Sequence, residues 1–135
     1  MIFLTKEIRV NSKAEDELID ITLEIRQFVE KSGVKVGSVT VFVPHTTAAV
    51  TINENCDPDV KLDFLTGMNQ SFQRNKNYYH SEGNSHAHIK SSVIGVSEEI
   101  LIDDSKLLLG TWQGVYFCEF DGPRTRRVIL RVKGI

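Results

Sequence analysis

Several features that define specialised protein classes are missing from this chain of 135 residues. It has only two cysteines, Cys56 and Cys118, which form no CxxC motif, so we expect free thiols and a reducing, cytoplasmic setting. No apolar run approaches the roughly 20 residues that span a bilayer, and the N-terminus lacks the basic start and cleavage site of a signal peptide. We therefore expect no membrane partner.

A basic excess is missing as well. The formal charge is -2 at pH 7 and the sequence pI is about 6.1, whereas proteins that neutralise nucleic-acid phosphates usually carry surplus lysine and arginine. We therefore expect no nucleic-acid partner. The chain also shows no linker, repeat or low-complexity segment, and its length suits one ordinary domain, so residues 1–135 are predicted to form a single domain.

What the chain does contain is typical of a soluble globular protein, with 41% hydrophobic and 25% charged residues. Apolar residues at helical spacing predict a helix over about 14–31, with Ser12 and Glu15 as its capping box and Gly33 as its stop. Asp57-Pro58 predicts the start of a second helix, which an apolar stripe extends to about Arg74. A short third helix is predicted over 86–94.

Alternating or β-branched segments predict the strands. They cover 2–10, 36–43, 46–53, 96–102, 107–121 with a break near Gly110 or Gly114, and 126–132. Because short turns join the last strands, those strands must be antiparallel. Two main helices and such strands predict an α+β fold with an antiparallel β-sandwich-like core.

The four histidines, His45, His80, His86 and His88, lie between positions 45 and 88. Imidazole is the commonest metal ligand and titrates near neutral pH. The cluster thus suggests a metal or catalytic site, although exposed loop histidines without a function are also common. No HExxH or CxxC motif decides between these interpretations.

Two carboxylates and one aromatic residue are notable for their positions. Asp57 suits a helix cap but also a base or metal ligand. Glu119 interrupts an apolar run, and buried carboxylates are uncommon unless they are paired. The candidates either to pair with it or to hold an oxyanion lie nearby in the sequence and are Arg124, Arg126 and Arg127. Trp112, the only tryptophan, is expected to pack in the core.

Three segments carry a resemblance to a known family. They are PHTTAAVTINENCDPDV (44–60), YHSEGNSHAHIKSSVIG (79–95) and GTWQGVYFCEFDGPRTRR (110–127). In this order they resemble the YjbQ-like family, also called the secondary thiamine-phosphate synthase family, over nearly the whole chain.

The resemblance implies a homotrimer with a weak ability to make thiamine phosphate from a pyrimidine diphosphate and a thiazole phosphate. It also implies a divalent metal such as zinc near the histidines, for which we expect His45, His80 and His88 as ligands. The expected contacts to a phosphorylated substrate are Lys90, Ser91, Ser92 and Arg124, and the expected catalytic carboxylates are Glu119 and Asp57. The same residues would suit a different metal-dependent enzyme such as a hydrolase, or a non-enzymatic module that binds a metal or metabolite.

Overall fold

The computed structural model describes residues 1–74 and 77–135 of the chain. Its elements are β1 (Ile2–Asn11), β2 (Glu17–Asp20), α1 (Thr22–Ser32), β3 (Gly37–Phe42), β4 (Ala48–Glu54), α2 (Pro58–Ser71), α3 (Ser85–Ile94), β5 (Ser97–Asp103), β6 (Lys106–Leu107), β7 (Gln113–Glu119) and β8 (Thr125–Gly134). Within these ranges no helix has both the length and the apolar composition that crossing a membrane requires.

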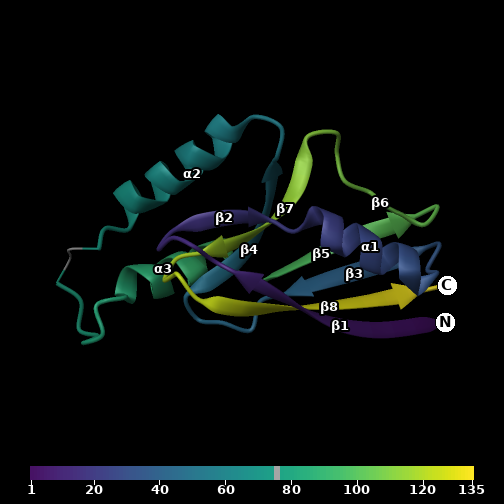
Figure 1. Cartoon of the computed structure of the whole chain (residues 1–135), viewed down its shortest axis with the longest axis horizontal. Coiled ribbons are helices and arrows are strands. Elements are labelled where there is room, and N and C mark those ends of the chain that lie inside the picture. Colours follow the sequence, from purple (N-terminus) through teal and green to yellow (C-terminus); the bar gives the residue numbers. More distant parts are fainter. Residues whose placement is uncertain (75–76) are drawn as a thin grey trace.

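The strands form two antiparallel sheets (Figure 1). Sheet A has the order β1-β8-β3-β5-β6, and sheet B has the order β2-β7-β4. The predicted α+β fold with a sandwich-like antiparallel core is therefore confirmed. The third, short helix is also present as α3, which begins after Asn84 and ends at Gly95.

The main core lies between the two sheets and is closed at one end by α1. Alternation along β3 and β8 turns Val39 and Leu130 inward, where they pack with Phe117 of β7 and Ile25 of α1. Neither face of β7 is exposed, because its alternate residues Tyr116 and Cys118 join a second apolar cluster on the other side of sheet B.

The second cluster is covered by α2 and α3 (Figure 1). Phe64, Leu65 and Met68 of α2 pack against it but stay partly exposed, and no residue of α2 is buried. Asp57 caps α2 as predicted, since its carboxylate accepts a hydrogen bond from the Asp59 amide at 2.9 Å. The helix is thus docked by one side only.

The predicted helix over 14–31 is wrong in its first half. Residues 17–20 form the strand β2, whose Leu18 pairs with Cys118 of β7, and the helix begins only at Thr22. Leu18 is at helical spacing from the apolar residues that follow it, which is why the pattern predicts a helix here. Pairing with β7 buries the Leu18 side chain instead, so tertiary contacts override the helical pattern. The predicted capping box is also wrong, because the Ser12 hydroxyl donates to Glu119.

Trp112 does not pack in the core as expected but is 59% exposed. Its loop, which makes the predicted break between β6 and β7, is held at both ends. The Asn55 amide donates to the Trp112 carbonyl at 2.9 Å, and the Gly110 amide donates to the Gln113 side chain at 2.8 Å. These bonds fix the backbone while the indole faces outward.

The two cysteines are both free, as predicted, but differ in exposure. Cys56 is exposed, whereas Cys118 is buried in the second cluster, and burial strongly raises the pKa of its thiol. Cys118 is therefore an unreactive core residue.

Candidate functional site

His45 lies in the connection between β3 and β4, at the end of the molecule where α3 packs (Figure 1). Pro44 cannot donate a ladder hydrogen bond, so the strand ends and the chain turns outward. The half-buried imidazole accepts a hydrogen bond at Nε2 from the backbone N–H of Arg127, at 3.0 Å. In the neutral ring, that bond assigns the proton to Nδ1 and makes His45 a hydrogen-bond donor on its other side.

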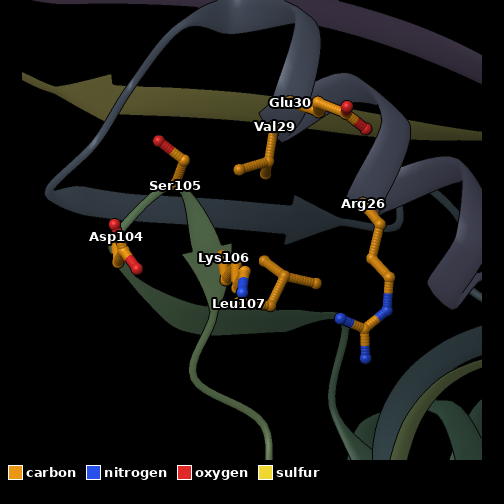
Figure 2. A pocket seen from close by; sticks show the side chains of 7 residues that line it. All are labelled: Arg26, Val29, Glu30, Asp104, Ser105, Lys106 and Leu107. Carbon is orange, nitrogen blue, oxygen red and sulfur yellow. The ribbon is translucent and has the colours of Figure 1, made fainter.

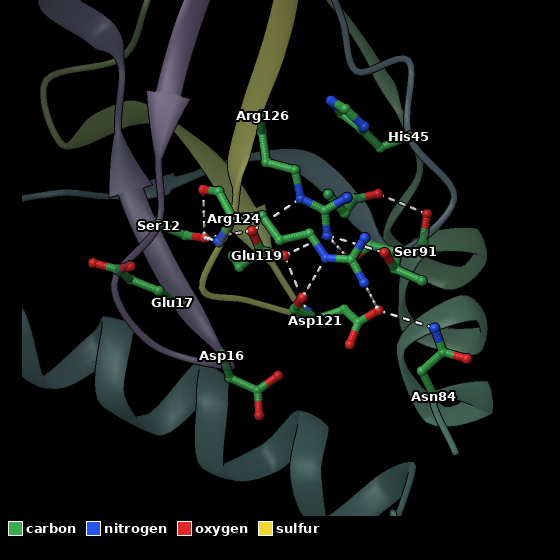
Figure 3. Close-up of polar contacts among 12 residues, drawn as sticks. Ser12, Asp16, Glu17, His45, Asn84, Ser91, Glu119, Asp121, Arg124 and Arg126 are labelled. Atoms are coloured by element: carbon green, nitrogen blue, oxygen red, sulfur yellow. Dashed lines mark hydrogen bonds and ion pairs between the residues drawn. The ribbon is translucent and has the colours of Figure 1, made fainter. Parts of the chain in front are cut away.

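A buried ion pair between Arg126 and Glu119 lies next to the connection that carries His45 (Figure 3). Arg126 donates to both oxygens of Glu119, at 2.9 and 2.5 Å, and both side chains are almost inaccessible to solvent. The Ser12 hydroxyl and the Asp121 amide also donate to the carboxylate, at 2.6 and 3.0 Å. The Glu119 carboxylate thus accepts four hydrogen bonds, which stabilise its charged form.

The same guanidinium reaches the connection that carries His45. Nη2 of Arg126 donates to the hydroxyl and the carbonyl of the buried Thr47, at 2.9 and 3.3 Å. Since Arg127 binds His45 through its backbone, two successive residues of β8 hold this turn at His45 and at Thr47.

These contacts and burial shift the pKa values of His45 and Glu119. Burial lowers the pKa of His45, and the positive charge of Arg126 lowers it further, so the ring is neutral near pH 7. For Glu119, burial raises the pKa, but the hydrogen bonds from Arg126, Ser12 and Asp121 together outweigh it and leave the pKa lowered. Glu119 is thus ionised at neutral pH.

His45 forms a wall of two cavities. We call the first the His45 pocket; it has a volume of about 380 Å³, and His88, Ser91 and Ser92 of α3 lie across it from His45 and Thr46. We call the second the arginine pocket; it has about 280 Å³ and is lined by Glu7, Arg9, His45, Thr125, Arg126 and Arg127. Because His45 lines both cavities, a ligand in either of them can contact its imidazole.

The predicted metal ligands come together only in part. The rings of His80 and His88 meet edge to face with centroids 5.4 Å apart, and His88 faces the same pocket as His45. However, Nε2 of His45 is already occupied by the Arg127 N–H, and within residues 1–74 and 77–135 no group of three or more His, Cys, Asp or Glu side chains is placed to hold a metal ion. In this arrangement the three imidazoles do not fit a common metal.

The predicted phosphate contacts separate into two groups. Ser91 and Ser92 line the His45 pocket, although the Ser91 hydroxyl donates to the Ala48 carbonyl at 2.6 Å. Lys90 does not line it: the side chain is fully buried, and its ammonium binds Asn69 of α2 at 2.5 Å and Asp16 at 3.4 Å. Lys90 therefore ties α2 to α3 instead of offering a free cation.

Arg124 is likewise turned away from the pocket. Its guanidinium binds the backbone carbonyl of Asp121 at 2.9 Å and the carboxylate of the same residue at 2.8 Å (Figure 3). Asp121 in turn accepts from Asn84 at the start of α3, also at 2.9 Å. The Arg124 side chain is therefore linked through Asp121 to the start of α3 and does not line the His45 pocket.

The two predicted catalytic carboxylates are not placed to touch a substrate in this pocket. Glu119 is fully buried with its oxygens occupied, so it positions Arg126 and the His45 turn. Asp57 is an exposed helix cap that does not line the His45 pocket. His86, the fourth histidine, is buried near Glu15 in a separate cavity, and its pKa is lowered by burial and by the charges of Lys90 and Arg74.

Sequence reasoning missed the arginine pocket. Arg9 and Arg127 lie on neighbouring strands of sheet A, and only the register between β1 and β8 brings them together. The inward position of Arg126 did have a signal, because it continues the alternation of Val128, Leu130 and Val132, which face the core.

A further cavity, of about 390 Å³, lies at the other end of the molecule, between α1 and the turn from β5 to β6 (Figures 1 and 2). Figure 2 shows Arg26 and Glu30 on α1 and Asp104 and Lys106 at the turn, all of which line this cavity. It contains no histidine and is separate from the cluster around His45.

Several known proteins are similar to this chain in both sequence and fold. The family model described as UPF0047 protein YjbQ-like matches residues 6–135. UPF0047 protein YugU of Bacillus subtilis is 44% identical over 132 residues, which cover 97% of this chain and 100% of YugU. A crystal structure of a YjbQ/UPF0047 protein from Clostridium acetobutylicum is 50% identical with a TM-score of 0.93, covering 95% of this chain and 99% of the other. A structure from Sulfolobus solfataricus, described as a YbjQ-like protein of unknown function, is 33% identical with a TM-score of 0.96 and 98% coverage of both chains.

Proposed function

The chain belongs to the YjbQ-like UPF0047 family, and on that premise we propose that it is an enzyme that acts on a phosphorylated small molecule in the His45 pocket. The observation that carries the proposal is the neutral imidazole of His45, which is fixed by the Arg127 backbone and lines two cavities. Histidines, hydroxyls and arginines that converge on a cavity are typical of sites that transform anionic substrates.

His45 is suited to stabilise negative charge that develops on an oxygen atom. Its Nε2 is bonded to the protein, so Nδ1–H is the free donor, and the lowered pKa keeps the ring neutral at pH 7. A fixed donor of this kind needs no reorganisation when charge appears on a leaving oxygen.

His88 and Ser92 supply the remaining groups of the His45 pocket. His88, in its protonated form, can donate a proton to the oxygen of the departing phosphate group, and the exposed Ser92 hydroxyl can donate a hydrogen bond to a phosphate oxygen. His80 supports His88 by packing against its ring. No step of this proposal requires a metal ion.

The specific activity that we propose to test is the formation of thiamine phosphate, as the family resemblance implies. In that reaction a pyrimidine and a thiazole phosphate are joined while diphosphate leaves the pyrimidine. Charge develops on the departing diphosphate, which is the kind of group that a fixed imidazole donor and nearby arginines stabilise. A hydrolase acting on another phosphorylated compound is the second candidate, because the same donors serve a phosphate leaving group.

Replacing His88 by Ala should reduce thiamine-phosphate formation about 100-fold or more, since proton transfer by a positioned side chain contributes roughly 10²–10⁴-fold. The product is measured by chromatography, and metal content is measured on the same preparations after zinc loading and desalting. Thr111→Ala, in the Trp112 loop, serves as control and should retain full activity. No product from the wild-type protein would refute this activity. One equivalent of zinc that is retained by the wild-type protein and lost in His88→Ala would instead restore the predicted three-histidine metal site.

The homotrimer is also part of our proposal, because α2 leaves apolar surface uncovered. No residue of α2 is buried although Phe64, Leu65 and Met68 lie on it, and Leu62 is 57% exposed. Contact with a second chain would remove that surface from water. Light scattering at micromolar concentration should return three times the chain mass of 15.3 kDa. A mass equal to one chain would contradict the trimer.

A further inference from the structure

Two arginines face each other across neighbouring strands beside His45. Arg9 of β1 and Arg127 of β8 are directly opposed in the antiparallel register. Like charges in directly opposed positions destabilise a sheet, so this placement has a cost. Both residues are exposed, and both line the arginine pocket.

The charges around this pocket do not cancel. Arg126 is neutralised by the buried Glu119, and Arg127 binds Glu7 at 3.0 Å. Arg9 forms no ion pair with any residue in the described parts of the chain, 1–74 and 77–135. The arginine pocket thus contains one uncompensated guanidinium, together with the Thr125 hydroxyl and the His45 ring as uncharged polar groups.

We infer that the arginine pocket is a phosphate subsite, in which the guanidiniums of Arg9 and Arg127 and the hydroxyl of Thr125 bind one phosphate group. Arginine forks match the geometry of phosphate oxygens and form charge-assisted hydrogen bonds to them. The anion also relieves the repulsion between the two opposed guanidiniums. None of the residues predicted from the sequence to contact phosphate lies in this pocket.

The inference deepens the proposed function and rests on it for the identity of the substrate. Because His45 is a wall of both cavities, a phosphate in the arginine pocket is adjacent to the reacting end of a ligand in the His45 pocket. The substrate class is therefore a small molecule with two anionic groups, or two phosphorylated substrates that bind side by side. Glu7 limits the affinity, because its carboxylate competes with phosphate for Arg127.

The test is titration of the protein with inorganic phosphate at low ionic strength, with binding measured by isothermal calorimetry and by amide NMR. Arg9→Met should weaken phosphate binding about tenfold or more, since a charge-assisted hydrogen bond to phosphate is lost. Glu7→Gln should strengthen binding severalfold, because it frees Arg127. Arg131→Met removes the same charge from the same exposed face of sheet A, outside the arginine pocket, and is the matched control, with an expected change below twofold.

Equal weakening by Arg9→Met and Arg131→Met would overturn the subsite and indicate nonspecific attraction to a basic face. Weaker binding in Glu7→Gln would overturn it as well. These outcomes are independent of the enzymatic proposal, which is tested through His88→Ala. Phosphate binding that depends on Arg9, in a protein without turnover, would leave the subsite in place and remove the reaction.

Discussion

Arg126→Met should lower the free energy of unfolding by about 3–5 kcal/mol, the usual cost of leaving one partner of a buried ion pair alone. Its loss leaves the Glu119 carboxylate fully buried without its two-pronged donor, and Thr47 loses the hydrogen bond that holds the His45 turn. Chemical denaturation followed by circular dichroism measures the change. A loss below 1 kcal/mol would contradict this account of the pair.

The neighbouring residue provides a matched control for that measurement. Arg127→Met removes the same side chain from an exposed pair with Glu7, which should contribute no more than about 1 kcal/mol. Adding Glu119→Gln to Arg126→Met removes the unpaired charge, so the double variant should be more stable than the sum of the two single changes predicts. Arg126→Lys keeps the charge but cannot donate to both Glu119 oxygens as the guanidinium does, so its free energy of unfolding should lie between those of Arg126→Met and the wild type.

The pH dependence of stability follows from the same pair. The pKa of Glu119 is lower in the folded protein than in the unfolded chain, so its contribution is complete above the ordinary carboxyl value of about 4.3. It is lost as the pH falls through the lowered native value. The wild-type protein should therefore lose stability in acid more steeply than Glu119→Gln.

His45→Ala should reduce turnover of a phosphorylated substrate about 10²–10³-fold, the usual effect of removing one fixed donor to a developing oxyanion. The loss should appear in kcat, because the donor acts most strongly when charge develops on the leaving oxygen. His45→Gln retains an amide donor at this position and should recover part of the activity. Thermal unfolding of both variants should remain near wild type, because the ring is only half-buried.

The pH profile distinguishes this role from a purely structural one. Protonation of His45 would abolish the hydrogen bond that Nε2 accepts from Arg127, so activity should fall on the acid side. Since burial and Arg126 lower the pKa of His45, the midpoint of that fall should lie below the ordinary histidine value of about 6.5. A midpoint well above 6.5, or a profile unchanged in His45→Ala, would show that another group titrates.

Local patterns in the sequence determined most of the elements. Alternation identified β3 and β8, a segment rich in Thr, Val and Ile identified β4, and the Asp57-Pro58 pair marked the start of α2. Strand composition and helix caps depend on neighbouring residues. The sequence also showed that Glu119 was an unusual carboxylate that needed a partner. These conclusions rest on interactions within about a dozen residues.

Only the tertiary structure decided how the histidines, arginines and Lys90 are used. Lys90 follows His88 closely in sequence, yet helix rotation turns it inward to Asn69 while Ser91 and Ser92 line the pocket. Arg9 and Arg127 are far apart in sequence and meet only through the register of β1 with β8. Burial and strand register are set by contacts between distant segments, and these contacts also placed β2 where helical spacing predicted a helix.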